Sequence, residues 1–394
     1  MEPPSRRAVL GYMGTLGGLS LAGCLGDESL AYDVFQLGGT QTKPLWDHAD
    51  SDRPGYLTLL ASDEDEPWMV DDPADHEGLR EWYTDTDFEE SVVLYLQSIG
   101  LNSCYDELDV SRVADEGDRI AGGVTAVDTS DDDTACAEAI TYPAAFVRVT
   151  GDDLPGEALF RITTGYGTGG IVSSDDRLVD PATLPGSIRP AGDPETVPEE
   201  LSCADPAFER HFNPVDDDAN LWWGDVEVDG ETQFALRLLD TRDKRTRNEN
   251  DNGGSDESEN GESDEGEIEI GDAARRRFER GDELTIRLTN VHDGFVTTGN
   301  KHKYSLLVET EAGLEDVRGW TDGEPRGYTD EGVRHRPGTA FEWTIQLTED
   351  GLLADHTHDD RLTVCPSLPA GRYWFVYWGL TGDRSVAVAF DYVD

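Results

Sequence analysis

The sequence predicts a mainly all-β protein that is built from two β domains. Its apolar residues gather in short runs, and turn signals rich in Gly, Pro and Asp separate these runs. In the clearest run, Glu283–Asn290, Leu or Ile alternates with Thr or Arg, which places one face of a strand inward. The whole chain has 394 residues, and this length suggests two or three domains.

The first predicted domain covers residues 24–164. Its candidate strands lie at residues 32–37, 56–60, 122–127, 144–149 and 158–162, and the stretch 87–96 ends in the pattern of a buried strand. Their spacing is typical of a small antiparallel β domain. Residues 165–218 are rich in Gly, Pro and Asp, and we expect them to form an extended linker. The glycine run that opens this linker lacks the Lys-Ser/Thr pair of a phosphate-binding loop.

The second predicted domain covers residues 219–394. Its candidate strands lie at residues 232–239, 283–290, 304–309, 341–347, 371–378 and 385–390. Strands at these spacings predict an immunoglobulin-like antiparallel sandwich.

An acidic insert at residues 248–267 interrupts the second domain. It is almost entirely Asn, Gly, Ser, Asp and Glu, so it cannot bury a core and is expected to be disordered. Basic residues flank it on both sides, namely Arg242, Lys244, Arg245, Arg247, Arg275, Arg276, Arg277 and Arg280. One interpretation is a loop whose basic stems balance nearby acids. The other is a cationic patch under an acidic flap, which would dock an anionic surface polymer.

Four stretches of the second domain carry a family resemblance, at residues 281–290, 317–323, 337–343 and 368–373. They resemble the intracellular proteinase inhibitor family and related bacterial immunoglobulin-like modules, over about residues 281–380. The matching features are a Pro-Gly turn before one strand and a Pro-Ala-Gly-x-Tyr turn before another. The resemblance implies an immunoglobulin-like fold. It is weaker evidence for protease inhibition, because the matching turns specify the scaffold.

Residues 87–150 carry a second resemblance. The order of Asp87–Leu94, Ala121–Val124 and Cys136–Val149, with Thr141-Tyr142-Pro143 before the last strand, is similar to the C-terminal domain of protease-complex regulatory lipoproteins. The Gly-Gly-Tyr turn of that family is replaced here by Asn102–Tyr105. The missing glycine turn counts against a binding role shared with that family.

The first 24 residues predict export and a lipid anchor. Arg6 and Arg7 form a twin arginine, which is an export signal read by a receptor. The apolar run 8–23 is shorter than the roughly 20 residues of a spanning helix, so we expect residues 1–23 to be removed. Residues 21–24 resemble a lipobox, which implies lipid on Cys24 and the outer face of the cell membrane as the location. The alternative is an uncleaved N-terminal anchor with Cys24 incidental.

The charge of the chain indicates a halophile. The net charge is −53, from 84 acidic and 31 basic residues, and acids are spread along the whole chain. Such self-repulsion destabilises a compact state in dilute salt, whereas molar salt screens it. With the N-terminal signals, this composition resembles a twin-arginine-exported lipoprotein of the haloarchaeal type. Nucleic acid is excluded as a partner, because no basic stripe with interleaved aromatic residues is present.

The cysteines predict disulfides. Beside Cys24 the chain has Cys104, Cys136, Cys203 and Cys365, an even number that suits an exported protein. Three pairings are open, and we favour Cys104 with Cys136 and Cys203 with Cys365. The first pair is close in sequence, and the second would tie the linker to the last domain.

No motif for catalysis or a cofactor is present. The chain lacks Gly-x-Ser-x-Gly and Ser-x-x-Lys, and it has no Cys-x-x-Cys pair for zinc. The best metal candidate is the group of His356, His358 and Asp360, which a hydrated loop explains equally well. Calcium at the Asp-rich turns is a further alternative, but no spaced Asp-x-Asp-x-Asp-Gly pattern supports it.

Aromatic residues supply one candidate binding surface. The pair Trp222-Trp223 and the run 373–378 could form a carbohydrate platform, although the alternation of a strand sends about half of the run into the core. The two adjacent tryptophans cannot point the same way on a strand, so one of them is expected at the surface.

These observations predict a non-enzymatic binding or scaffolding protein that is anchored to the cell surface by lipid. Its partners would be the membrane and a surface protein or polymer of unknown identity. The first alternative is a regulator or inhibitor of an extracytoplasmic protease, for which residues 292–303 are the candidate reactive loop. The second is a hydrolase whose site the sequence does not reveal.

The charge generates a prediction about salt. We expect the protein to unfold or expand as the salt concentration falls well below molar, because its acidic residues then repel each other. Circular dichroism during dialysis into dilute buffer measures this change. An unchanged spectrum would contradict the prediction.

Overall fold

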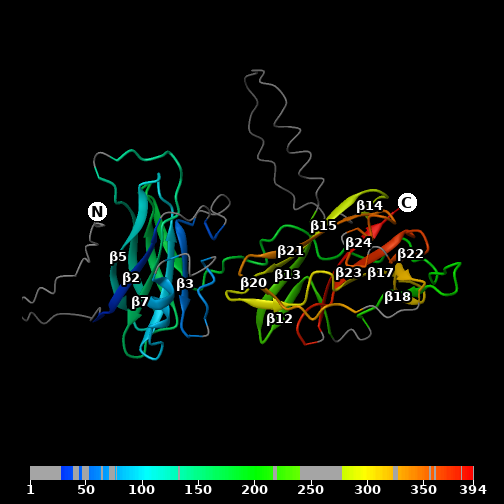
Figure 1. Ribbon diagram of the computed structural model, residues 1–394, viewed down its shortest axis with the longest axis horizontal. Helices are drawn as coiled ribbons and strands as arrows, with labels where there is room; N and C mark the ends of the chain where they lie inside the picture. The colour runs from blue at the N-terminus through cyan, green and yellow to red at the C-terminus, as the bar shows by residue number, and fades with distance from the viewer. Residues whose placement is uncertain are drawn as a thin grey trace, which may run out of the picture.

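The computed structural model describes residues 28–38, 44–46, 53–63, 65–70, 76, 78–131, 134–215, 220–239, 277–322, 327–354, 356–358, 361–382 and 384–393. These residues are nearly all β, with several antiparallel sheets that fall into two groups (Figure 1). Our predictions for Arg6, Arg7, Cys24, Asp360 and the insert 248–267 lie outside the described residues. Within the described ranges, no helix has both the length and the apolar character of a membrane span.

The N-terminal group consists of two sheets that enclose one hydrophobic core. The five-stranded sheet has the order β1 (Glu28–Ser29), β5 (Tyr105–Asp115), β6 (Ile120–Asp128), β8 (Ala158–Thr163) and β9 (Gly169–Ser173). The four-stranded sheet has the order β2 (Ala31–Gly38), β7 (Ala144–Thr150), β4 (Ser91–Ser98) and β3 (Gly55–Leu60). Apolar residues from both sheets meet in the core between them. All of these pairings are antiparallel except β6 with β8, which is parallel.

Strand β4 is buried on both faces, which explains its unbroken apolar sequence. Leu94 and Leu96 point into the core between the two sheets. Val93 and Tyr95 belong to a second cluster, which Trp46, Trp68 and the short helix α1 (Leu79–Thr84) complete. The strand covers Ser91–Ser98, as expected from the prediction that the stretch 87–96 ends in a buried strand, and residues 87–90 before it form a turn.

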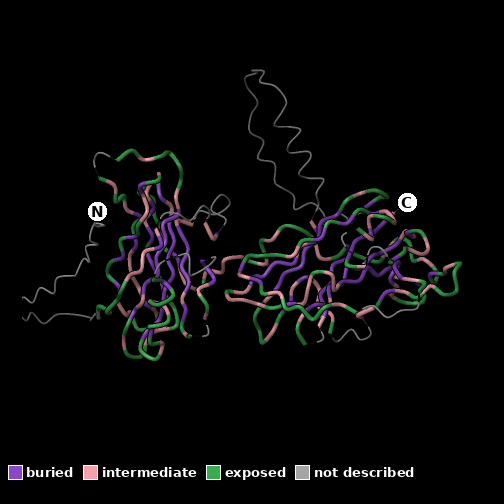
Figure 2. Tube along the Cα trace, in the orientation of Figure 1, coloured by how far each residue is buried: buried purple, intermediate pink, exposed green. Residues whose placement is uncertain are grey.

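The C-terminal group has two larger sheets. One has the order β11 (Leu221–Trp223), β24 (Ser385–Tyr392), β23 (Gly371–Tyr377), β17 (Tyr304–Thr310) and β18 (Gly313–Asp316), and β14 (Arg277–Phe278) also pairs with β24. The other has the order β12 (Asp225–Val228), β13 (Glu231–Leu239), β15 (Glu283–Asn290) and β21 (Ala340–Gln346). Their facing residues form the largest buried cluster, which is the interior of this group in Figure 2.

Two small sheets lie beside this core. One contains β10 (Glu209–Arg210), β19 (Arg318–Trp320) and β22 (Thr363–Val364), and the other contains β16 (Val296–Thr298) and β20 (Val333–His335).

The prediction of antiparallel pairing holds for most neighbouring strands. It is wrong for β6 and β8 of the N-terminal group, which pair in parallel, and for β11 and β14, which both run parallel to β24 along its outer edge. Short segments that return from elsewhere in the chain can add to an edge in either direction.

Sequence analysis overlooked three strands of the N-terminal group, namely the two-residue β1, β5 and β9. β5 buries Leu108, Val110 and Val113, and its register shifts between Ser111 and Ala114. This irregularity breaks the two-residue period that the prediction relied on. β9 lies inside the segment 165–218, which we expected to be a linker, and it pairs with β8 despite its two leading glycines.

Both favoured disulfides are formed. The Cα atoms of Cys104 and Cys136 are 5.5 Å apart, and those of Cys203 and Cys365 are 5.8 Å apart. The first bond joins the start of β5 to the loop before β7. The second ties the segment before β10 to the loop after β22.

Candidate functional site

The outer face of the six-stranded C-terminal sheet carries the most promising site. Along β23 and β24 successive side chains point to opposite faces, so large aromatic residues such as Phe375 and Phe390 enter the core. Trp374 points the other way, and it stands opposite Ala389 in the register of the two strands. Ala387 likewise stands opposite Trp223 of β11. The outer face therefore places small side chains between two tryptophans.

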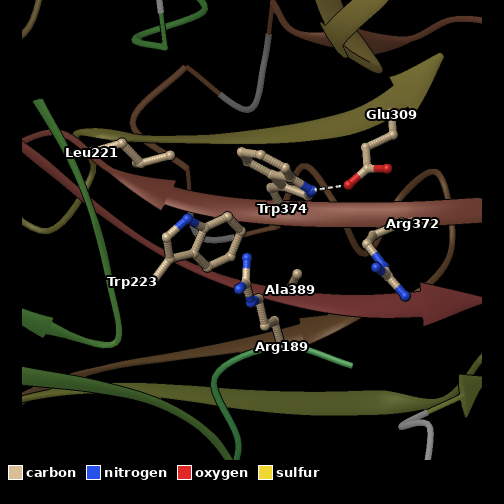
Figure 3. A pocket seen from close by; sticks show the side chains of 7 residues that line it. All are labelled: Arg189, Leu221, Trp223, Glu309, Arg372, Trp374 and Ala389. Atoms are coloured by element: carbon tan, nitrogen blue, oxygen red, sulfur yellow. Dashed lines mark hydrogen bonds between the residues drawn. The ribbon is translucent and has the colours of Figure 1, made fainter. Parts of the chain in front are cut away.

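These small residues leave a hollow. The cavity has a volume of about 350 Å³ and is lined by Arg189, Leu221, Trp223, Glu309, Arg372, Trp374 and Ala389 (Figure 3). The two indole rings meet edge to face, with their centroids 4.6 Å apart and an interplanar angle of 70°. Both tryptophans stay partly exposed, so their rings are accessible from solvent. A pocket of this size accepts a small molecule or one or two units of a polymer.

Polar groups surround the two rings. The Nε1 atom of Trp374 donates a hydrogen bond to Glu309 Oε1 over 2.6 Å. Arg372 donates to Asp391 over 2.8 Å and to the carbonyl of Gly192 over 2.8 Å, so its charge is already paired. The guanidinium carbon of Arg189 lies 5.1 Å from the centre of the Trp223 ring. The pocket thus offers apolar ring surface, a carboxylate and an exposed cation.

The aromatic platform considered from the sequence is divided between the two faces of the sheet. Tyr373, Phe375 and Tyr377 are buried in the core, whereas Trp374 faces outward. Trp222 packs against the core and Trp223 against the outer cluster, as the alternation of a strand requires. Trp378 lies beyond the end of β23, where its ring contacts Phe212 and Tyr328.

Sequence analysis did not identify Arg189, Glu309, Arg372 and the alanines as parts of a site. Arg189 comes from the segment expected to be a linker, and nothing local in its sequence indicates that it reaches β24. The run 385–390 does carry a usable signal, since its apolar residues alternate in size. Alanines at every second position beside an outward tryptophan predict a hollow on that face.

A second cluster gathers histidines around a buried ion pair. His356 is buried, and its ring centroid lies 5.9 Å from that of His358. The third residue of the predicted metal group, Asp360, is outside the described residues. Among the residues that the structure describes, no three His, Cys, Asp or Glu side chains are placed to hold a metal ion.

A continuous series of hydrogen bonds joins the side chains of this cluster. The amide of His358 donates to His356 Nδ1 over 3.1 Å, and His356 Nε2 lies 3.3 Å from the Tyr328 hydroxyl. That hydroxyl lies 2.6 Å from His211 Nε2, and His211 Nδ1 lies 3.3 Å from Asp316. One placement of hydrogens satisfies every step, with each imidazole donating at one nitrogen and accepting at the other. This arrangement is structural, because the side chains occupy one another's polar atoms.

This series of hydrogen bonds ends at a fully buried ion pair. Arg318 donates to both carboxylate oxygens of Asp316, over 3.1 and 3.0 Å, and neither side chain is exposed. Burial alone would raise the pKa of Asp316, but the charge of Arg318 and the hydrogen bond from His211 hold it well below its usual value. The carboxylate therefore remains ionised, and breaking the pair would leave a buried charge without its partner.

Ser305, His211 and Asp316 resemble a hydrolytic triad but do not form one. Ser305 Oγ lies 3.4 Å from His211 Nδ1, and Asp316 lies 3.3 Å from the same nitrogen. A triad needs the serine and the carboxylate on opposite nitrogens of the imidazole. Ser305 is also completely buried, and its hydroxyl donates to the carbonyl of Phe212. This grouping cannot activate a nucleophile toward a substrate.

Comparison with known proteins found no matching family model, no significantly similar curated protein and no significantly similar solved structure.

The buried histidines generate a prediction about pH. Burial lowers the pKa of His356 to about 3 and that of His335 to about 4, whereas both titrate near 6.5 when unfolded. Between these values the unfolded chain binds more protons, so stability is lost as the pH falls from 6.5 toward 4. The loss should be on the order of 3 kcal/mol for each histidine. Denaturant unfolding in molar salt at several pH values measures it.

The variants His356→Gln and His335→Gln provide the check. Each should flatten the dependence of the free energy of unfolding on pH between 6.5 and 4. His292→Gln is the matched control, because His292 is partly exposed and pairs with Glu231. If the control flattens the curve as much as the other two variants, burial is not the cause.

Proposed function

We propose that the protein is a lipid-anchored, non-enzymatic binding protein of the cell surface that works in high salt and binds carbohydrate in the Trp223–Trp374 pocket. The observation that carries this proposal is the pair of partly exposed indole rings above Ala389, with Glu309 and Arg189 at the rim. In this reading the C-terminal group of sheets is an immunoglobulin-like module and the N-terminal group is a separate β domain.

Carbohydrate suits this pocket for a chemical reason. The C–H faces of a sugar ring pack on an indole ring, while its hydroxyls need hydrogen-bond partners at the edge of the site. Trp374 and Trp223 offer the ring surface, and Glu309 offers carboxylate oxygens that accept from hydroxyls. Molar salt screens long-range attraction, but it leaves close packing and short hydrogen bonds in place. The site is therefore suited to work in brine.

The location rests on the N-terminal sequence and the cysteines. Arg6 and Arg7 fit an export signal, and Cys24 fits lipidation at the outer face of the membrane. The two disulfides favour an oxidising compartment. A tethered module with an open pocket would hold a surface polymer close to the membrane.

The protease-inhibitor alternative is less favoured by the structure. It needs residues 292–303 as a free loop, but Phe295 packs against the cluster around Trp68 and Tyr95. Val296–Thr298 is strand β16, and Thr298 is buried against His335. A segment held in this way does not extend into the cleft of a protease. The hydrolase alternative finds no support in Ser305, as described above.

Removal of either ring should weaken carbohydrate binding. We expect Trp374→Ala and Trp223→Ala to weaken binding at least tenfold, because a stacked ring supplies much of the affinity of such a site. An array of neutral and acidic oligosaccharides, probed with the full chain in molar salt, measures this. Tyr166→Ala is the matched control, since Tyr166 is also an exposed aromatic residue but lies between β8 and β9. Saccharide binding that survives both tryptophan substitutions would refute the assignment.

Cys24→Ser should release the protein from the membrane. Lipid on Cys24 supplies the anchor in this proposal, and the variant lacks the thiol that would carry it. Fractionation of cells measures the shift from membrane to soluble fraction, and intact mass of the purified wild type measures the modification. A wild-type mass without lipid would end the lipoprotein assignment.

A further inference from the structure

We propose that the Trp223–Trp374 pocket selects an acidic sugar, whose carboxylate pairs with the guanidinium of Arg189. This inference rests on the proposed carbohydrate binding and adds the chemical class of the sugar. It depends on where Arg189 is held, on the pairing of the other arginines, and on the position of Glu309.

Arg189 is presented from a fixed backbone. Ser187 pairs with Leu238 of β13 through two backbone hydrogen bonds of 2.9 Å each. The carbonyl of the next residue, Ile188, accepts a hydrogen bond of 2.7 Å from the amide of Ala389, in the floor of the pocket. Pro190 then restricts the chain on the other side. The Arg189 side chain therefore starts at a defined point beside β24, although the surrounding segment has little regular structure.

The side chain is also directed toward the rings. Its guanidinium carbon lies 5.1 Å from the centre of the Trp223 ring, and Figure 3 shows the group rising between Trp223 and Ala389. A cation above an indole face is attracted by the ring. A guanidinium held there keeps N–H groups free to bind a carboxylate with two parallel hydrogen bonds.

Arg189 differs from the other arginines of this region in its pairing. Arg372, Arg237 and Arg210 each form an ion pair, with Asp391, Asp225 and Glu315 respectively. Among the described residues, no carboxylate lies within ion-pair distance of Arg189. The position of this arginine at an aromatic pocket indicates that the missing carboxylate comes from the ligand.

Glu309 sets the orientation of that ligand. It belongs to β17, whereas Arg189 lies beside the far edge of β24, with β23 and Trp374 between them. A carboxylate on the ligand is repelled at the Glu309 end and attracted at the Arg189 end. Hydroxyls can face Glu309, which already accepts from Trp374 Nε1. Because molar salt reduces the Debye length to about 3 Å, only an anion in direct contact with Arg189 gains from this charge.

A matched pair of sugars tests the inference. The probes are a glucuronate-containing tetrasaccharide and its carboxyl-reduced derivative, titrated into the full chain in molar salt by calorimetry. Wild type should bind the acidic probe at least tenfold more tightly than the reduced one. Arg189→Gln should lose this preference, so that it binds the acidic probe no more tightly than the reduced one. Arg189→Lys should keep part of the preference, since it retains the charge but loses the paired N–H groups.

The controls separate this inference from the proposed function. Arg161→Gln removes an exposed arginine from β8 and should leave the preference unchanged, and circular dichroism verifies that each variant is folded. If wild type binds both probes equally well, the preference for acidic sugars is refuted and carbohydrate binding stands. If Arg189→Gln retains the full preference, Arg189 is not its source. If wild type binds neither the probes nor any array saccharide, both proposals fall.

Discussion

The alternation of side chains along β23 and β24 is the constraint on which the rest of the C-terminal structure depends. One face of these strands supplies aromatic residues such as Tyr373 and Phe390, whose rings stack in the core at a centroid distance of 5.6 Å. The same alternation forces Trp374 outward and aligns it with Ala389. A one-residue slip in register would turn the alanines toward the core and the aromatic residues toward the outer face, so folding of the core and formation of the pocket are one event.

The two polar clusters of this region have different roles, one in the interior and one at the pocket. Around Asp316 and Arg318 the ion pair is fully buried, and hydrogen bonds through His211 and Tyr328 join β17–β19 to the loops that carry Tyr328 and His356. Such a network makes the interior rigid. Around Arg189 and Glu309 the polar groups remain at the rim of an open pocket. A rigid interior with an incompletely paired rim is the combination that a binding site requires.

The sequence predicted the parts of the fold that follow from local periodicity, and it failed where distant segments meet. The runs that became β13, β15, β17, β23 and β24 are rich in apolar and aromatic residues, so their strands were predictable, and in β15 the two-residue alternation also indicated the inward face. β5 was not predicted because its register shifts inside the strand, and β9 was not predicted because it begins with two glycines. Trp223 and Trp374 were visible as candidate aromatic residues. Arg189 was not, because its place in the site depends on a backbone hydrogen bond to Ala389, two hundred positions along the chain.

The most direct test of the central claim is the structure of the full chain in molar salt with a bound saccharide from the array. Our account predicts a sugar ring packed on Trp223 or Trp374 over Ala389, with its polar groups reaching Glu309 and Arg189. A saccharide bound elsewhere on the molecule, with this pocket left empty, would contradict the account.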